Sequence, residues 1–441
     1  MNIDPTLVDT VKEAVYLRRE RILTFFREIV RIPSENHPPG GDEEAAQRVV
    51  ADRLRDLGLD VDFFEPAAVP NAERHPGWWP GRDYTRRPNV VAVWSASPKR
   101  GRSLILNSHI DVVPAGSREL WAYPPYGAQI VDGRVYGRGT ADAKIGITAI
   151  VEAVAVLRDL GLQPAGDVIV ESVVDEELGG YNGTVATLAR GYSADAAIVT
   201  EPTGFAVAGA QKGGQVFRMR VQGDAYHHAF WERGSSALDN AFYLKAALAA
   251  WERLREEETR HDFYYGERAR QFHPRPVHAD TVWYLRAGDP EIMANPADAE
   301  LRFWVDHLPG EDREDMLRRF ETHVRAAAAE HPFLRAHPPL LEREVMRPFT
   351  GVAIPPDAPI VTALLQATTA VLGREVPVVG LEAATDAMIF NLYSSVPAVV
   401  WCGGDLSVAH APNEFVEADD VLRSTAALAL AVLNFCGLQA P

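Results

Sequence analysis

Cysteine is almost absent from this chain of 441 residues. The two cysteines, Cys402 and Cys436, are far apart and form no Cys-x-x-Cys motif. Two thiols are too few for a disulfide scaffold or for a metal site built from thiolates. Zinc-finger and thiolate chemistry are therefore excluded, and oxygen and nitrogen atoms are the donors left for any metal.

Long apolar runs are also missing. No stretch approaches the ~18 consecutive apolar residues that a membrane helix needs. The first residues, Met1-Asn-Ile-Asp-Pro-Thr, lack the basic region and apolar core of a secretory signal. These absences predict a protein without a membrane partner, placed in the cytoplasm.

Basic residues are in the minority. The chain has 44 Lys and Arg against 61 Asp and Glu, which gives a formal net charge of −17. Such a balance argues against nucleic acid or an anionic membrane as a partner. It suits a protein that gathers carboxylates around cations, although a generally acidic surface explains it equally well.

Apolar runs alternate with helical patterns in the first half of the chain. The expected strands are residues 61–64, 90–94, 104–107, 168–174 and 196–200, and the expected helices are 6–31, 43–57 and 143–160. This alternation predicts an α/β domain with a mostly parallel sheet and helices on both faces. Residues 70–88, rich in Pro, Gly, Trp and Arg, are expected to form a long surface loop, with a place beside the functional site as one alternative.

The order of elements changes after residue 204. Strand, helix, strand, strand, helix, strand is the order typical of a small α+β sandwich. From about residue 341 the pattern returns to the first domain, and 441 residues exceed what one hydrophobic core usually supports. We therefore predict a catalytic domain of residues 1–212 and 341–441, interrupted by an inserted domain of residues 213–340.

Polar side chains stand where the apolar strand Leu104-Ile105-Leu106 ends. His109 and Asp111 come directly after it, at the end of a strand where open α/β sheets bind their ligands. A histidine that binds metal through one ring nitrogen needs the other nitrogen held, and Asp111 is suitably spaced to hold it. The alternative is an ordinary strand-end histidine satisfied by a carboxylate.

Further candidate ligands follow at comparable places. Asp142 precedes a helix, where aspartate is also a good N-cap. Glu176 and Glu177 follow an apolar strand as successive carboxylates, which repel each other unless a cation offsets them. Glu201 closes another strand, and His410 lies in a loop after the last one. Oxygen and nitrogen donors suit Zn²⁺, Co²⁺ or Mn²⁺, and five ligands are enough for two ions if one carboxylate bridges them.

Five motifs of this sequence, in their order, resemble those of the dinuclear metallopeptidase family that includes acetylornithine deacetylase, succinyl-diaminopimelate desuccinylase, aminoacylase and glutamate carboxypeptidase. The resemblance extends from about residue 12 to residue 435. The motifs are His109-Ile-Asp, Tyr136-Gly-Arg-Gly-Thr-Ala-Asp-Ala-Lys, Asp175-Glu-Glu-Leu-Gly-Gly, Glu201-Pro-Thr and Ala409-His-Ala-Pro-Asn-Glu.

This resemblance implies the role of each residue. Asp142 would bridge two metal ions, zinc first, with cobalt or manganese as alternatives. The remaining ligands would be His109 and Glu201 at one ion, and Glu177 and His410 at the other. Glu176 would be the general base that takes a proton from a shared water and returns it to the leaving amine. Asp111 would orient His109, and a cis peptide is expected after Asp142.

The inserted domain resembles the family's lid or dimerisation domain, which implies a homodimer. His227 is the candidate to reach a partner's active site and stabilise the oxyanion there, with an exposed surface histidine as the alternative. The sequence departs from the pattern at Asp306, which stands where relatives carry an arginine that helps to hold a substrate carboxylate. This departure favours a basic, neutral or aromatic substrate.

The sequence thus predicts a metal-dependent hydrolase that cleaves the N-acyl or N-formyl amide of a small amine or amino-acid derivative. An exopeptidase of the dipeptidase or carboxypeptidase type is the first alternative. A deaminase that displaces an amine from an aromatic ring, and a catalytically inactive binding protein, are the others. The presence of all five candidate ligands and of Glu176 argues against the last.

Overall fold

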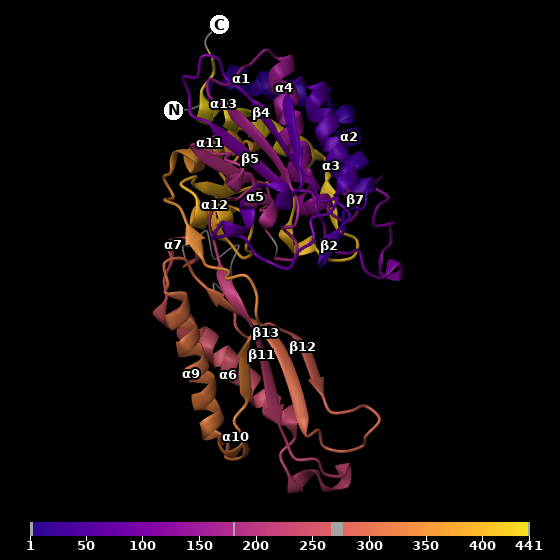
Figure 1. The fold of residues 1–441 in the computed structure, drawn as a ribbon, viewed down its shortest axis with the longest axis vertical. Helices are drawn as coiled ribbons and strands as arrows, with labels where there is room; N and C mark the ends of the chain where they lie inside the picture. Colours follow the sequence, from indigo (N-terminus) through magenta and orange to yellow (C-terminus); the bar gives the residue numbers. More distant parts are fainter. Residues whose placement is uncertain (1–2, 180, 266–276, 440–441) are drawn as a thin grey trace. The chain divides into compact units, whose positions relative to one another are not determined.

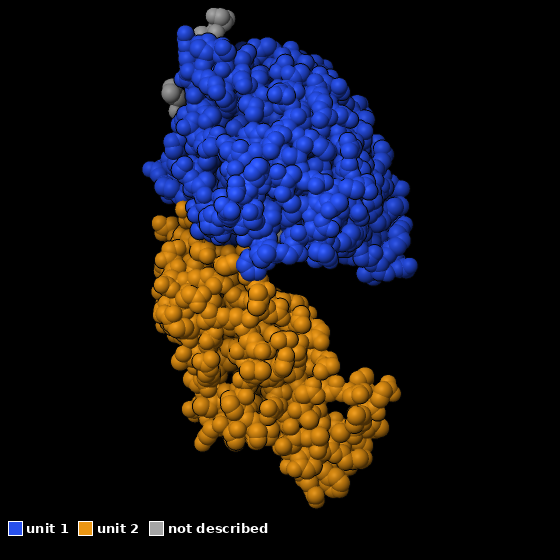
Figure 2. Space-filling model, in the orientation of Figure 1, with its two compact units in different colours: residues 1–210, 354–381, 385–441 blue, residues 211–353, 382–384 orange. Residues whose placement is uncertain are grey.

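The computed structural model of the chain describes residues 3–179, 181–265 and 277–439. They form two compact units, shown as a ribbon in Figure 1 and coloured separately in Figure 2. Unit 1 comprises residues 1–210, 354–381 and 385–441, and unit 2 comprises residues 211–353 and 382–384. Gly180, which closes the motif beginning at Asp175, lies outside the described residues.

A mixed sheet forms the centre of unit 1 (Figure 1). The strands that unit 1 contributes to it are, in spatial order, β10 (Val207–Gln211), β17 (Ala398–Val400), β9 (Ala196–Val199), β5 (Leu104–His109), β8 (Val168–Val173), β4 (Asn89–Trp94) and β3 (Asp60–Phe64), with β16 (Val378–Leu381) beside β10. The four central strands, β17, β9, β5 and β8, run parallel. All four are fully buried, as expected for parallel strands covered on both faces.

The strands at one side of this sheet depart from the parallel pattern. β3 pairs antiparallel with β4, and β4 pairs antiparallel with β8. The connection from β3 to β4 contains only the short turns η1 (Pro66–Ala68) and η2 (Ala72–Arg74), whereas a parallel pair usually needs a helical crossover.

Helices cover both faces of the sheet, and the predicted α/β fold is confirmed. The helices of unit 1 are α1 (Pro5–Leu17), α2 (Arg19–Arg31), α3 (Glu44–Asp56), α4 (Ile145–Asp159), α5 (Asn182–Ala189), α11 (Pro359–Leu372), α12 (Ala387–Tyr393) and α13 (Ala418–Cys436). The main core lies between the sheet and the layer that includes α4 and α13, both buried along most of their length. The single helix expected over residues 6–31 is two helices. Arg18 interrupts them, and its guanidinium donates to the Ala14 carbonyl (3.1 Å) and to Asp159 at the end of α4 (2.7 Å).

Smaller elements complete unit 1. They are β1 (Asn36–His37), β2 (Gly40–Gly41), β6 (Gln129–Val131), β7 (Arg134–Tyr136), β18 (Phe415–Glu417), and the short turns η3 (Arg118–Leu120), η4 (Thr140–Lys144) and η6 (Leu406–Val408). β18 pairs with β7, which brings the C-terminal part of the chain next to the segment before η4. No described helix combines the length and apolar character required to cross a membrane.

Unit 2 contains an antiparallel sheet in the order β12 (Val282–Ala287), β13 (Asp298–His307), β11 (Gly213–Gln222) and β14 (Leu340–Arg343). Its other elements are η5 (His228–Arg233), α6 (Ala237–Glu258), α7 (Asp262–Tyr265), α9 (Arg313–Glu330), α10 (Pro332–Ala336) and β15 (Val352–Ala353). Alternate side chains of β11 and β13, such as Phe217 and Phe303, form a core with α6 and α9. The inserted domain was predicted to end at residue 340. The compact unit extends to Ala353 because β14 is the fourth strand of its sheet.

Glu171 is a buried carboxyl group between the main sheet and α5. It lies on β8 and accepts hydrogen bonds from Asn107 Nδ2 (2.9 Å) and Thr187 Oγ1 (3.2 Å). Burial raises the pKa of Glu171 from 4.5 to about 7, although these two hydrogen bonds partly oppose the shift. The folded chain therefore holds a proton that the unfolded chain releases between these values, and stability falls as the pH rises through this range.

We predict that Glu171→Gln removes this pH dependence, because glutamine keeps an acceptor but never carries the charge. The melting temperature of the variant relative to wild type should rise as the pH increases from 5 to 7 and then level off. Thermal unfolding at several pH values measures this, with exposed Glu73→Gln as the control. A difference that stays constant from pH 5 to 8 would contradict it.

Candidate active site

Three neighbouring strands of unit 1 end beside one another. β5 pairs in parallel with β8 on one side and with β9 on the other, and His109 is the last residue of β5. Glu176 and Glu177 follow β8, and Glu201 follows β9. Parallel strands present their carboxyl ends at one edge, so these side chains converge as the sequence predicted.

The imidazole of His109 is buried and its two nitrogens have different surroundings. Nδ1 lies 2.9 Å from the backbone oxygen of Asp111 and 3.7 Å from Asp111 Oδ1. A carbonyl can only accept, so Nδ1 carries a proton and the lone pair is left on Nε2. Nε2 faces Asp142 Oδ1 at 3.0 Å and Glu201 Oε1 at 3.4 Å. A lone pair directed at two carboxylates requires a cation between them, either a proton or a metal.

Asp142 faces both histidines of the site. Its Oδ1 is 3.0 Å from His109 Nε2, and its Oδ2 is 3.4 Å from His410 Nε2. Asp142 lies in η4, directly before α4, and the expected cis peptide to Ala143 is present. Burial alone would raise the pKa of Asp142, but hydrogen bonds and charge from the two histidines hold it well below its usual range.

His410 and Glu177 form the second half of the arrangement. Glu177 Oε2 lies 2.8 Å from His410 Nε2, and Glu177 Oε1 accepts the backbone N–H of Val113 (3.2 Å). The His410 side chain is 53% exposed, whereas the other residues of this group are buried. The site therefore opens to solvent on the His410 side.

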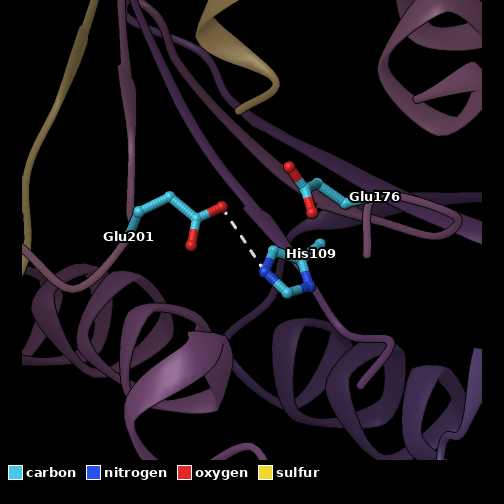
Figure 3. A group of neighbouring side chains, drawn as sticks. All are labelled: His109, Glu176 and Glu201. Atoms are coloured by element: carbon cyan, nitrogen blue, oxygen red, sulfur yellow. Dashed lines mark ion pairs between the residues drawn. The ribbon is translucent and has the colours of Figure 1, made fainter. Parts of the chain in front are cut away.

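Glu176 contributes a carboxylate on the side of Glu201. One oxygen or nitrogen atom from each of His109, Glu176 and Glu201 lies within 4.8 Å of the others. Figure 3 shows these three side chains. Burial and the nearby charge of Glu201 raise the pKa of Glu176 well above 4.5. A raised pKa is the property that a carboxylate needs to accept a proton near neutral pH.

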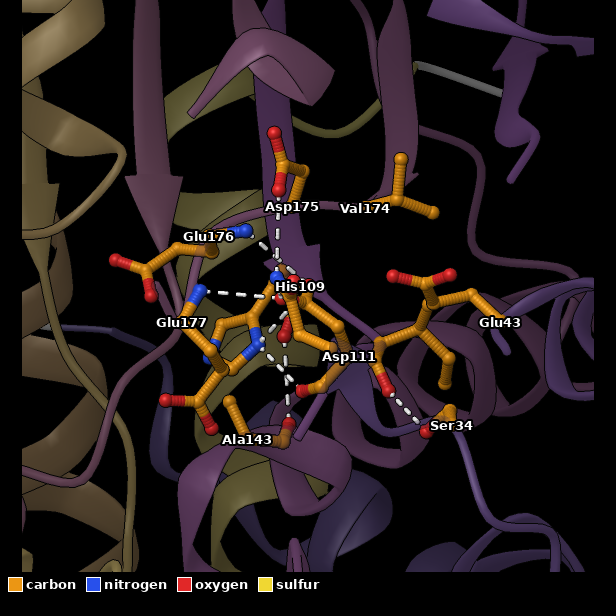
Figure 4. A network of polar contacts seen from close by, with 12 residues as sticks. Ser34, Glu43, His109, Asp111, Ala143, Val174, Asp175, Glu176 and Glu177 are labelled. Atoms are coloured by element: carbon orange, nitrogen blue, oxygen red, sulfur yellow. Dashed lines mark hydrogen bonds and ion pairs between the residues drawn. The ribbon is translucent and has the colours of Figure 1, made fainter. Parts of the chain in front are cut away.

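Asp111 lies next to His109 and contacts the loop of the two glutamates (Figure 4). Its carboxylate accepts the backbone N–H groups of Glu176 (3.3 Å) and Glu177 (3.1 Å), as well as Asn36 Nδ2 (2.8 Å). Burial opposes ionisation, yet the hydrogen bond and charge of His109 lower the pKa of Asp111 to about 2. Asp111 therefore holds the imidazole and the loop of the two glutamates together.

The donor set fits divalent cations. Four carboxylates, from Asp142, Glu176, Glu177 and Glu201, lie beside two imidazoles, and burial raises the pKa of Glu177 to about 7 and of Glu201 to about 8. Added positive charge would stabilise their ionised forms. Oxygen and imidazole donors without sulfur suit Zn²⁺, Co²⁺ and Mn²⁺.

Two predicted residues belong to unit 2. His227 is exposed and caps η5 by accepting the backbone N–H of Ala229 (3.3 Å). Its ring lies 4.3 Å from that of His228, at an interplanar angle of 33°. Asp306 is buried and accepts hydrogen bonds from Trp304 Nε1 (2.8 Å) and the backbone N–H of His278 (2.8 Å). The metal-ligand candidates of unit 1 are thus gathered without either residue.

Sequence reasoning gave no role to Glu414, which supports Asp142. Glu414 is fully buried, and its Oε1 accepts the backbone N–H groups of Ala141 (2.9 Å) and Asp142 (3.2 Å). Arg138 donates to Glu414 Oε2 (2.6 Å) and to the backbone oxygen of His410 (3.2 Å). Arg138 and Glu414 both lie within the recognised motifs. Their charge, in motif positions to which no role was assigned, was the signal that could have identified them.

Lys144 was also assigned no role from the sequence. Its ammonium group is buried and donates to the carbonyl oxygens of Ile29 (3.0 Å) and Ile32 (2.8 Å). It thereby ties the segment of Asp142 to the end of α2. Nothing in the motif distinguished this lysine from a surface one.

Comparison with curated proteins finds relatives along nearly the whole chain. An N-formyl-4-amino-5-aminomethyl-2-methylpyrimidine deformylase of Halalkalibacterium halodurans is 26% identical over 456 residues, covering 98% of this chain and 99% of the relative. A probable succinyl-diaminopimelate desuccinylase of Staphylococcus aureus is 24% identical over 353 residues, covering 76% of this chain and 83% of the relative.

A solved structure has the same fold, and a family profile identifies the chain. Human carnosine dipeptidase 1 matches with a TM-score of 0.72 and 16% identity, covering 99% of this chain and 100% of that one. The profile of peptidase family M20/M25/M40 matches residues 105–434, which include every candidate metal ligand. This chain therefore belongs to peptidase family M20/M25/M40 and is a metal-dependent amide hydrolase.

Proposed function

We propose that this protein removes the formyl, or another small acyl, group from the nitrogen of a small amine by hydrolysis at two divalent metal ions. The observation that carries the proposal is the position of Asp142, whose two oxygens face the Nε2 atoms of His109 and His410. A carboxylate between two imidazoles, each accompanied by a glutamate, is suited to bridge two ions.

The residues that would hold the metals divide into two sets. His109 and Glu201 would bind one ion, and Glu177 and His410 would bind the other. Asp142 would bind both ions. Zinc is the first candidate, with cobalt and manganese as alternatives. When bound, the ions would supply an activated water and polarise the carbonyl of the amide.

Glu176 performs the proton transfer in this proposal. Its carboxylate accepts a proton from the attacking water as the new carbon–oxygen bond forms. The same proton then passes to the nitrogen as the carbon–nitrogen bond breaks, which releases a free amine and a carboxylate, or formate from a formyl group. Burial and the charge of Glu201 raise the pKa of Glu176 above its ordinary value, which favours the role of proton acceptor.

Two observations favour an N-formyl amine without a carboxylate as the substrate. The deformylase relative from Halalkalibacterium halodurans aligns over 98% of this chain. The second is Asp306, which stands where the resemblance places an arginine that helps to hold a substrate carboxylate. A chain without that arginine favours a substrate that has no carboxylate to bind.

We predict that the metal-loaded protein releases formate from an N-formyl aminomethylpyrimidine. Turnover of N-acetylornithine, N-succinyl-diaminopimelate and dipeptides, measured in the same assay, should be at least about tenfold slower in kcat/KM. Dialysis against a chelator should abolish turnover, and Zn²⁺, Co²⁺ or Mn²⁺ should restore it. Faster cleavage of a dipeptide would favour the exopeptidase alternative, and turnover that survives metal removal would exclude a metal mechanism.

Glu176→Gln separates proton transfer from metal binding. Glutamine has a similar shape but cannot accept the proton, so we predict that kcat falls by about 10²–10⁴-fold while the metal content stays that of wild type. Metal analysis and formate release measure the two effects. Glu119→Gln, an exposed residue of η3, is the control, and near-normal turnover of Glu176→Gln would remove Glu176 as the base.

We also propose a homodimer formed through unit 2. β12 is an edge strand of its sheet and exposes Trp283, Tyr284 and Leu285. The segment of His227 exposes the apolar side chains Tyr226, Phe230 and Trp231, and the segment paired with it at Ala294 exposes Ile292 and Met293. Edge strands and clustered apolar side chains are surfaces that proteins usually cover with a partner. The cytoplasmic location expected from the sequence stays a prediction.

Mixing two inactive variants tests whether His227 acts across this dimer. His227→Ala and Glu176→Gln should each be inactive alone, whereas a mixed dimer has one site with an intact Glu176 and an intact partner histidine. After random exchange of subunits we predict recovery of about one quarter of wild-type turnover. Absence of recovery in a demonstrated mixed dimer would contradict a role in trans, and His228→Ala is the matched control.

A further inference from the structure

Asp175, directly before the proposed base Glu176, has an unusual conformation and many partners. Its φ is +66°, in the left-handed region that residues other than glycine rarely adopt, and it is fully buried. Its backbone oxygen accepts the N–H of Tyr181. The turn that presents Glu176 and Glu177 therefore depends on what holds Asp175.

The carboxylate of Asp175 is held chiefly by residues of the connection between β3 and β4. Arg82 donates through Nε (2.8 Å) and through Nη2 to Asp175 Oδ1, and the hydroxyl of Tyr84 donates to Oδ2. Arg87 Nη2 and Asn36 Nδ2 lie farther from Oδ1, each at 3.3 Å. The segment expected to be a surface loop thus reaches the active-site turn.

Arg82 also reaches the partner of His109. The same Nη2 donates to Asn36 Oδ1 (2.5 Å), and Asn36 Nδ2 donates to Asp111 Oδ2 (2.8 Å). Asp111 in turn accepts the backbone N–H groups of Glu176 and Glu177 and faces His109 Nδ1. One guanidinium therefore connects the turn that carries the base with the group that orients a metal ligand.

We propose that Arg82 is a positioning residue for the hydrolysis, acting on Glu176 through Asp175 and on His109 through Asn36 and Asp111. Among the described residues, the hydrogen bonds of Arg82 go to Asp175 and Asn36, neither of which is a proposed ligand or the proposed base. Its planar fork suits this place, because Nε and Nη2 can donate to a carboxylate and to an amide oxygen at once. The proposal rests on the proposed function, in which Glu176 is the base.

Arg87, in the same network, is paired mainly with Glu43, although its Nη2 also lies 3.3 Å from Asp175 Oδ1. It is fully buried, and Nε and Nη2 both donate to the buried carboxylate of Glu43. The Arg82 side chain, by contrast, is 8% exposed, and both of its partners lead to the site. Its removal should therefore affect turnover more than folding, and should leave a space that a small cation can enter.

The test compares metal-loaded Arg82→Ala with wild type. Because the turn loses its strongest donor, kcat should fall by about 10–100-fold while KM changes by less than about threefold. Guanidinium at about 50 mM, far below denaturing concentrations, should restore kcat by about tenfold. Arg74→Ala, from the same connection but exposed, is the control and should behave as wild type, with no response to guanidinium.

Arg82→Lys keeps the charge but not the fork, so its kcat should lie between those of Arg82→Ala and wild type. It also serves if the alanine variant does not fold. A kcat within about threefold of wild type in the variant that folds would overturn the proposal, because second-layer partners of such sites normally contribute more than this. So would a lower kcat that guanidinium leaves unchanged, or one explained entirely by lost metal.

A readout without turnover separates this proposal from the proposed function. Zn²⁺ affinity, measured by competition with a chelator, should weaken by about tenfold in Arg82→Ala and recover with guanidinium, because Asp111 orients His109. If wild type releases no formate but this pattern of affinities holds, the proposed reaction fails and the positioning role stands. If wild type turns over, Glu176→Gln does not, and Arg82→Ala equals wild type, only the positioning role fails.

Discussion

The buried charge of four carboxylates is the constraint on which the site depends. Asp142, Glu176, Glu177 and Glu201 are gathered beside two imidazoles, and burial raises the pKa of the three glutamates, which makes their ionisation unfavourable. Such a group is stable only if cations offset the charge, whether protons or metals. Metal affinity therefore follows from the close spacing of these carboxylates in the fold, and the supporting contacts maintain that spacing.

The fold meets this constraint with backbone groups and with a few buried ions. Parallel strands bring His109, Glu176, Glu177 and Glu201 to one edge of the sheet. Asp142 and His410 come from separate loops, and Glu414 and Arg138 hold these two loops together. Asp111 performs the same task on the other side, where it joins His109 to the turn of the glutamates. The proposed ligands are thus positioned by residues that are not themselves proposed to bind metal.

Much of this arrangement could be predicted from the sequence, because buried parallel strands have a clear apolar pattern and their ends identify the ligand edge. The α/β class, the inserted unit and the convergence of His109 with the glutamates followed from that pattern and from the recognised motifs. The contacts of Asn36, Arg82 and Lys144 could not be predicted. Asn36 and Arg82 lie in segments without periodicity, and Lys144 occupies a motif position usually interpreted as surface. The partners of all three residues are distant in sequence. The end of the inserted unit was misplaced for a related reason, since a four-residue strand such as β14 carries too little pattern to show which sheet it joins.

The proposed substrate preference rests on a residue outside the proposed metal site. The proposed metal ligands and Glu176 belong to unit 1, whereas Asp306, at the expected position of an arginine, is buried in unit 2. An arginine at that position would favour a carboxylate, but Asp306 is itself stabilised by Lys212, Trp304 and the backbone of His278. A single replacement by arginine would therefore leave Lys212 facing a second cation, and would not simply restore carboxylate binding. Because the surrounding residues pair with the aspartate, more than one substitution would be needed to reverse the proposed preference for a substrate without a carboxylate.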